Sequence, residues 1–162
     1  MSMRNQPIKR SEYLKELSRD HHHGLLFCWE IKQGISKKIE LERLRKYAEY
    51  FWINHLKEHF KEEEELLFKY ANDPLCEKAK EDHGLIQKQV ELIINSVAQQ
   101  PKNYIDLIEM LSNHIRFEER ELFSHLENIL PLEILQATKN FFSPQNYTAN
   151  KNNYVDEFWV KV

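Results

Sequence analysis

A ten-residue pattern occurs twice in this chain and constrains its fold more than any other feature. Residues 59–68 read HFKEEEELLF and residues 114–123 read HIRFEERELF, so both segments fit H-x3-E-E-x2-L-F. A shorter element accompanies the pattern, because Asp-His is followed by Gly-Leu in both 20–25 and 82–85. Five identities over ten positions are difficult to obtain by chance. We therefore interpret the chain as two copies of one helical hairpin.

Proline and glycine divide the chain into long helical segments. Proline is tolerated in the first turn of a helix but not in its interior, and Asp73-Pro74 is typical of an N-cap followed by the first helical residue. Gly34 suits the left-handed residue just past a helix end, and Asn103 with Asp106 is expected to cap the last long helix. The expected helices cover about 11–33, 40–71, 74–99 and 103–130, with a shorter fifth helix over 132–140.

The fold class predicted from these segments is all-α. Short connections make sequential helices antiparallel neighbours, so we expect an up-down-up-down antiparallel four-helix bundle with a short extra helix and a C-terminal tail. We expect one bundle domain over 1–142, and an extension over 143–162 that packs on the bundle or on a partner. Apolar residues at helical spacing support the bundle: Leu14, Leu17, Leu25, Cys28 and Ile31; Ile86, Val90, Ile93 and Val97; Leu107, Leu111, Ile115 and Leu122.

Composition excludes several function classes. With 3 glycines, glycine-rich phosphate loops and all-β sandwiches are disfavoured. The net charge of −3 contains no clustered basic excess, so nucleic-acid binding is not expected. No segment approaches the roughly 18 apolar residues of a membrane span, and the N-terminus has no apolar signal region. Cys28 and Cys76 form no CxxC motif and are expected to be structural. We expect a soluble cytoplasmic protein without a membrane partner.

The repeated motif places polar side chains on apolar helix faces. Residues four apart lie about 40° apart around a helix and about 6 Å along it, so each motif histidine and its following glutamate point the same way. A buried carboxylate costs several kcal/mol unless it is paired, and no lysine or arginine lies on these faces at the same level. A pair of metal ions would meet this need, since imidazole and carboxylate suit Fe, Mn or Zn. The inward-facing candidates are His21, His59, Glu63, His83, His114 and Glu118.

Three alternatives remain open at this point. His22 replaces His21 if the phase of the first helix differs from the one assumed. His55 lies one turn before the second-helix motif, and we interpret it as a histidine outside the metal ligands, with a seventh ligand as the alternative. Glu62 to Glu65 form an acidic run that is expected to be solvated except at Glu63, for which Glu62 is the fallback.

The sequence resembles the hemerythrin-like, or HHE cation-binding, family over about residues 11–130. The two Asp-His pairs and both copies of H-x3-E-E-x2-L-F carry this resemblance. It implies a bundle around an oxo- or hydroxo-bridged pair of iron ions, with Zn or Mn as substitutes. Carried over position by position, the ligands are His21, His59, Glu63, His83, His114 and Glu118, and the two glutamates bridge the irons.

The chain departs from the oxygen-carrying hemerythrins at two places. Those proteins have a second histidine one turn after the third-helix histidine, where this chain has Gln87. They also end with H-x4-D, whereas this chain has H-x3-E. The four-histidine, two-glutamate set is more similar to the branch of the family linked to nitric-oxide and iron–sulfur stress.

Four functions are compatible with these residues. The favoured one is a di-iron protein that binds O2 or NO for sensing, storage or detoxification, and the alternative is an iron-handling or iron–sulfur repair protein with a labile site. The third is an oxidase or peroxidase, which needs a proton donor such as Tyr47, Tyr50 or His55. The fourth is a structural bundle. A metal- and diatomic-binding protein is favoured over a turnover enzyme, and the sequence does not fix the oligomeric state.

Overall fold

The computed structural model of the chain describes residues 12–147 and 153–160, and every regular element among them is helical. The all-α prediction is therefore confirmed for these residues. In chain order the elements are α1 (Lys15–Ser36), α2 (Leu41–Phe51), η1 (Trp52–Leu56), α3 (Lys57–Leu66), η2 (Phe68–Tyr70), α4 (Pro74–Asn95), α5 (Pro101–Phe117), η3 (Glu118–Leu122), α6 (Phe123–Ile129) and α7 (Leu132–Phe141).

Two of the expected long helices contain a π-helical turn. The second expected helix consists of α2, the π-helical η1 and α3, and the fourth consists of α5, the π-helical η3 and α6. A π-helical turn inserts an extra residue into an α-helix, and such turns are frequent at functional sites. Here η3 begins at Glu118, one of the predicted site residues.

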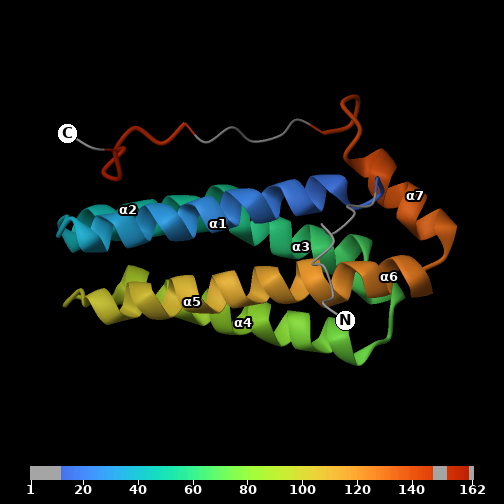
Figure 1. Ribbon diagram of the computed structural model, residues 1–162, viewed down its shortest axis with the longest axis horizontal. Coiled ribbons are helices and arrows are strands. Elements are labelled where there is room, and N and C mark those ends of the chain that lie inside the picture. Colours follow the sequence, from blue (N-terminus) through green and yellow to red (C-terminus); the bar gives the residue numbers. More distant parts are fainter. Residues whose placement is uncertain (1–11, 148–152, 161–162) are drawn as a thin grey trace, which may run out of the picture.

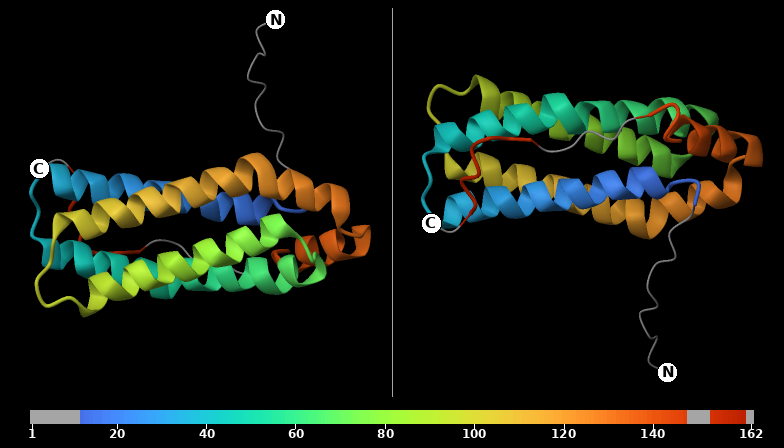
Figure 2. Two further views of the ribbon diagram at one scale, coloured as in Figure 1. Left: turned by 90° about the horizontal axis from the view of Figure 1, so that it is seen from below. Right: turned by 90° about the horizontal axis from the view of Figure 1, so that it is seen from above.

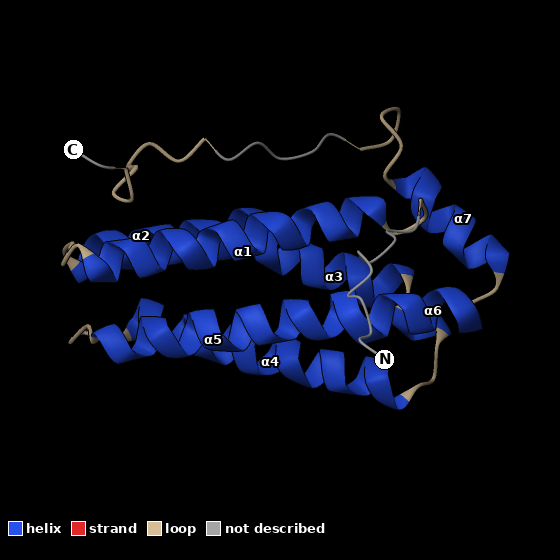
Figure 3. Cartoon of the chain, viewed as in Figure 1, coloured by secondary structure: helices blue, strands red, loops and turns tan. Residues whose placement is uncertain are grey.

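The long helical segments lie lengthwise beside one another. Figures 1 and 2 show α1, α2–α3, α4 and α5–α6 side by side, with α7 across the end where α6 finishes. α5 packs against both α1 and α4, and α2 packs against α4. The loops that join these segments, drawn in tan in Figure 3, lie at their ends, so the interior is built from helix faces.

Helix ends agree with the sequence at one position and differ at others. The Asp73 side chain accepts a hydrogen bond from the Leu75 amide at 2.8 Å, and Pro74 is the first residue of α4, as expected. The prediction for Gly34 is wrong, because α1 continues to Ser36 and the left-handed residue is Lys38, with φ 57°.

Gly34 has a packing role instead. A Cβ at this position would lie 2.8 Å from both a Leu44 and a Phe158 side-chain atom. Glycine is therefore needed for close approach between α1, α2 and the C-terminal segment, which explains why it stands in a helix despite its low helix propensity.

Two other helix ends were also mispredicted. Pro101 opens α5 and Gln100 precedes it, so Asn103 and Asp106 lie inside the helix and do not cap it. At the end of α4, the helix stops at Asn95 and leaves Val97 fully exposed. Val97 is therefore not part of the apolar face predicted for this helix.

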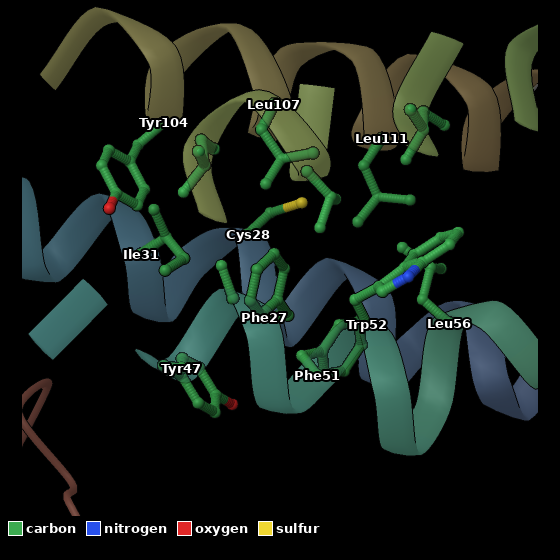
Figure 4. Packing of buried hydrophobic residues seen from close by; sticks show 14 of the residues in the cluster. Phe27, Cys28, Ile31, Tyr47, Phe51, Trp52, Leu56, Tyr104, Leu107 and Leu111 are labelled. Carbon is green, nitrogen blue, oxygen red and sulfur yellow. The ribbon is translucent and has the colours of Figure 1, made fainter. Parts of the chain in front are cut away.

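Two apolar clusters form the core. The first contains Phe27, Tyr47, Phe51 and their neighbours, and Figure 4 shows these side chains packed between the helices. The second gathers Leu17, Phe68 and other side chains near α6 and α7. All predicted face residues of α1 are buried except Leu25, which is 37% exposed because Gly24 takes the inward position.

The C-terminal residues 153–160 contact the outside of α1 and α2. Arg43 forms an ion pair with Asp156 at 2.6 Å, and the Lys37 ammonium donates a hydrogen bond to the Trp159 carbonyl. Phe158 is 4% exposed and packs in the first apolar cluster. The domain division at residue 142 stays a prediction. Within the described residues, no helix has the length and apolar character needed to cross a membrane.

Candidate metal centre

The structure brings all six predicted site side chains together in the interior. Each is between 0 and 5% exposed. They form two groups in which one ligand atom per residue lies within 4.8 Å of the others. The first group is His21, His59, Glu63 and Glu118, and the second is Glu63, His83, His114 and Glu118. Both glutamates belong to both groups, so the arrangement has two positions for a cation that share two carboxylates.

The atoms that face the centre are close together but lack hydrogen bonds. Each histidine Nε2 atom lies 2.5 to 3.3 Å from a carboxylate oxygen of Glu63 or Glu118. These four nitrogens and the four carboxylate oxygens are buried, and none has a hydrogen-bond partner. Buried polar atoms are normally hydrogen-bonded, so eight convergent exceptions indicate that another species completes the site. Nitrogen and oxygen donors of this type fit a divalent transition-metal ion.

Acidic side chains lie against the outward nitrogens of the four histidines. His59 Nδ1 lies 3.1 Å from Asp20, and His114 Nδ1 lies 3.1 Å from Asp82. His21 Nδ1 lies 2.8 Å from Glu119, and the fourth pair, His83 with Glu64, is longer at 3.6 Å. A carboxylate behind a metal-binding histidine fixes the tautomer and directs the other nitrogen at the metal.

Sequence reasoning did not assign this role to Asp20, Asp82, Glu64 or Glu119. The signal was present, since the aspartates precede the first and third histidines and the glutamates are the second acids of the repeated E-E pairs. Each acid acts on a histidine of another helix, and this crossing was not apparent from helix-by-helix reasoning.

A family comparison agrees with this geometry. The model of the hemerythrin HHE cation-binding domain matches residues 12–126. The chain belongs to this family. No curated protein and no solved structure matches the chain. Together, the family match and the two His/Glu groups indicate a metal-binding protein.

Electrostatics in this HHE domain favour a cation at the centre. Burial opposes protonation of the four histidines, but the carboxylates overcome it and raise the pKa of His59 to about 9 and of His83 to about 11. Burial also opposes ionisation of Glu63, yet His59 and His21 hold the pKa of that carboxyl well below its usual range. Without a metal, the centre therefore retains protons that balance its buried carboxylates.

Aromatic rings cover two of the imidazoles from the same positions of the repeat. Phe123 stacks on His21 with ring centroids 5.0 Å apart, and Phe68 stacks on His83 at 5.9 Å. These are the two phenylalanines that end the repeated motif. Phe60 stacks more closely on His83, at 3.9 Å. The rings restrict the imidazoles to one orientation and exclude water from that side.

The alternative candidates take other positions. His22 is exposed, and Gln87 is exposed with its amide donating to Glu91 at 3.0 Å. His55 is half-buried and belongs to neither group, although its Nε2 atom is buried without a hydrogen-bond partner. Glu62 is 5% exposed but is also outside both groups.

Glu62 and His55 line a cavity of about 50 Å³ that reaches His21 and His59. Burial raises the pKa of Glu62 to about 7, and the charges of Asp20, Glu58 and Glu63 add to this effect. The centre is therefore approached from one side by a cavity that α1, α2, η1, α3 and α5 line with both polar and apolar side chains.

Proposed function

We propose that this chain is a non-haem di-iron protein that binds O2 or NO for sensing, storage or detoxification. In this proposal His21 and His59 hold one iron, His83 and His114 hold the other, and Glu63 and Glu118 bridge the two. The helical segments would form an up-down-up-down antiparallel four-helix bundle around the centre. The observation that carries the proposal is the convergence of eight buried donor atoms without hydrogen bonds.

The chemistry of the donor set favours iron over harder or softer cations. Four neutral imidazoles and two carboxylates suit Fe, with Mn and Zn as substitutes, whereas Ca²⁺ and Mg²⁺ prefer oxygen-only sites. The two carboxylates offset half of the charge of two divalent ions. Bound iron would supply open coordination positions and reversible oxidation, because six protein side chains do not fill two coordination shells.

The residues around the centre bind, orient and shield it. Asp20, Asp82 and Glu119 hold three of the histidines through their outward nitrogens, and Glu64 lies 3.6 Å from that of the fourth, His83. Apolar side chains line the same cavity as His21 and His59; they include Phe51, Phe60, Leu111 and Ile115. A small uncharged ligand such as O2 or NO fits an apolar wall of this kind, because neither molecule needs strong hydrogen bonds.

A second function, iron handling with a labile site, is favoured by one observation. The same cavity is also lined by Glu16, Glu58 and Glu62, which suit the passage of a cation rather than of a neutral ligand. The two functions use the same centre and differ in how quickly iron leaves it.

The experiment that tests the proposal begins with metal-free protein and ferrous iron in the absence of air. Iron per chain is counted, O2 or NO is admitted, and the optical spectrum is recorded. Two irons per chain with a reversible near-ultraviolet and visible band support diatomic binding. Two irons that oxidise irreversibly, or that a chelator removes within minutes, favour iron handling. Less than one iron per chain contradicts the di-iron proposal.

A further inference from the structure

The internal repeat places an equivalent cavity beside each half of the centre. Aligning Asp20 with Asp82 relates α1 to α4, and aligning His59 with His114 relates α3 to α5. One cavity lies beside Asp20 and His59, and another lies beside Asp82 and His114. Each cavity is therefore lined by an aspartate and a histidine at equivalent positions of the repeat. The other lining residues, which we call the rim, can be compared position by position.

The two rims differ in charge or polarity at four equivalent positions that line both cavities. On the first rim stand Glu16, His23, His55 and Glu58. The matching residues of the second rim, in the same order, are Lys78, Leu85, Met110 and Asn113. Two acids and two imidazoles in one half thus correspond to a cation, an amide and two apolar side chains in the other.

The difference continues one turn deeper, at Glu62. Its repeat equivalent is Phe117, and the Lys78 ammonium lies 3.8 Å from the centre of the Phe117 ring. The Lys78 side chain lines the second cavity, and its positive charge would repel an approaching metal ion. In the first cavity the residue equivalent to Lys78 is the carboxylate Glu16, and the residue equivalent to Phe117 is the carboxylate Glu62.

Glu62 is a buried acid with an unsatisfied oxygen. The residue is 5% exposed, it lines the first cavity, and its Oε2 atom is buried without a hydrogen-bond partner. The charged groups that act on it are Asp20, Glu58, Glu63 and His59. Among the described residues, Arg19 is the one lysine or arginine that lines this cavity, and Glu16 holds its guanidinium at 3.2 Å. A buried carboxylate in acidic surroundings is stabilised by a cation.

We propose that this opening is the route by which a divalent metal ion enters and leaves the centre, and that Glu62 contacts the ion on the way. The inference rests on the proposed metal centre and adds its path of exchange. Acids at the rim raise the local concentration of cations. Glu62 lines the same cavity as His59 and is buried, whereas Glu58 is exposed. The cavity of about 50 Å³ exceeds the roughly 10–15 Å³ that one water needs, so an ion can keep part of its hydration.

The test compares rates of metal uptake with the final amount of metal bound. Metal-free full-length protein is mixed with excess ferrous iron without air at low ionic strength, and Co²⁺ is used in a parallel series because its absorption reports binding directly. In the double variant Glu58→Gln, Glu62→Gln the uptake rate is expected to fall about tenfold, with the final metal content unchanged. Removal by a chelator is expected to slow as well, because the ion leaves by the same path.

Two further variants make the result specific. Glu81→Gln removes one exposed acid from α4 outside this cavity and is expected to leave the uptake rate unchanged. Glu16→Lys copies the residue of the second rim onto the first without altering a buried side chain, and it is expected to slow uptake too. Glu16→Lys replaces the double variant as the test if circular dichroism shows that the double variant does not fold.

The outcomes separate this inference from the proposed function. Equal uptake rates in the wild type, the double variant and Glu16→Lys overturn the entry route, while two bound irons leave the metal centre intact. Slower uptake in these variants, combined with no binding of O2 or NO, supports the route and overturns the diatomic-binding function. Binding of neither iron nor cobalt by any variant overturns both proposals.

Discussion

The two halves of this molecule, α1 to α3 and α4 to α6, share an inner layer of side chains around the metal centre. They differ in the side chains that line the cavity beside it. Around the centre, each half supplies two histidines, one glutamate and two outer acids at equivalent positions of the repeat. At the rims, Glu16 and Glu58 in one half correspond to Lys78 and Asn113 in the other. The inner layer must balance buried charge, which restricts its residues. The rims carry no such restriction, so one half is able to specialise in access.

The largest expected effect is the loss of a residue that both halves share. We expect Glu118→Ala to abolish one metal position, because its two oxygens belong to both groups of candidate ligands. The helices should remain, since the histidines and apolar clusters are unchanged. Metal analysis and circular dichroism check this result, with Glu121→Ala as an exposed control on the same π-helical turn. Full metal occupancy in Glu118→Ala would show that Glu118 does not bridge.

A second prediction tests whether the acids that contact the outward histidine nitrogens contribute equally to metal affinity in the two halves. Asp20→Asn and Asp82→Asn each remove a carboxylate 3.1 Å from a histidine Nδ1 atom. Loss of such a partner typically lowers metal affinity by about 10–100-fold, and we expect similar losses for both variants in competition titrations. Asp106→Asn, on the exposed side of α5, is the control. A strong effect in one variant alone would mean that one metal position dominates the affinity.

The third prediction concerns protons held by each half. In the metal-free protein the pKa is about 9 for His59 and about 11 for His83, so both are protonated at pH 7. A histidine must be neutral to bind a metal, and the pKa values of His21 and His114 are raised as well, so loading at pH 7 is expected to release at least two protons. Calorimetry in two buffers of different ionisation enthalpy measures the number. Loading without proton release would contradict the charge balance described for the centre.

The same raised pKa values set how the metal-free protein depends on pH. Unfolded histidine has a pKa of about 6.5. The stability from these two groups is therefore complete below pH 6.5 and is lost as pH rises through about 9 and then about 11. We expect the melting temperature of the metal-free protein to fall over this range, and that of the loaded protein to fall less.

The smallest expected effect separates two glycines that look equivalent in sequence. A Cβ at Gly84 meets nothing within 4 Å, so Gly84→Ala should stabilise the helix by about 0.5–1 kcal/mol. A Cβ at Gly24 would lie 2.7 Å from Ile115 Cδ1, so Gly24→Ala should lack this gain or destabilise the protein. Chemical denaturation measures both. Equal stabilisation by the two substitutions would show that Ile115 moves aside freely.

The inner layer was predictable because its signal repeats. The spacing of His59 and Glu63, copied at His114 and Glu118, marked one face of each helix, and the apolar neighbours marked that face as buried. His21 was preferred over His22 on the same basis, and the structure buries His21 while His22 is exposed. Periodicity is informative wherever a helix has one buried face.

The remaining features depend on contacts between helices, which periodicity does not report. The Gly-Leu pairs that follow the two Asp-His pairs are not at equivalent positions of the repeat. Alignment of the Asp-His pairs makes Ile86 the equivalent of the buried Gly24, whereas Gly84 is exposed. The role of Gly34 depends on Phe158, which is distant in sequence. The acidic run Glu62 to Glu65 was expected to be solvated except at Glu63, which is wrong for Glu62: this residue is 5% exposed, and one of its oxygens is buried without a hydrogen-bond partner.

We propose that the inner layer holds two iron ions between the two halves of the molecule. Anomalous X-ray diffraction at the iron edge, on crystals of the iron-loaded protein, tests this directly. We expect two peaks, one between His21 and His59 and one between His83 and His114, with Glu63 and Glu118 in contact with both. A single peak, or peaks away from these six side chains, would contradict it.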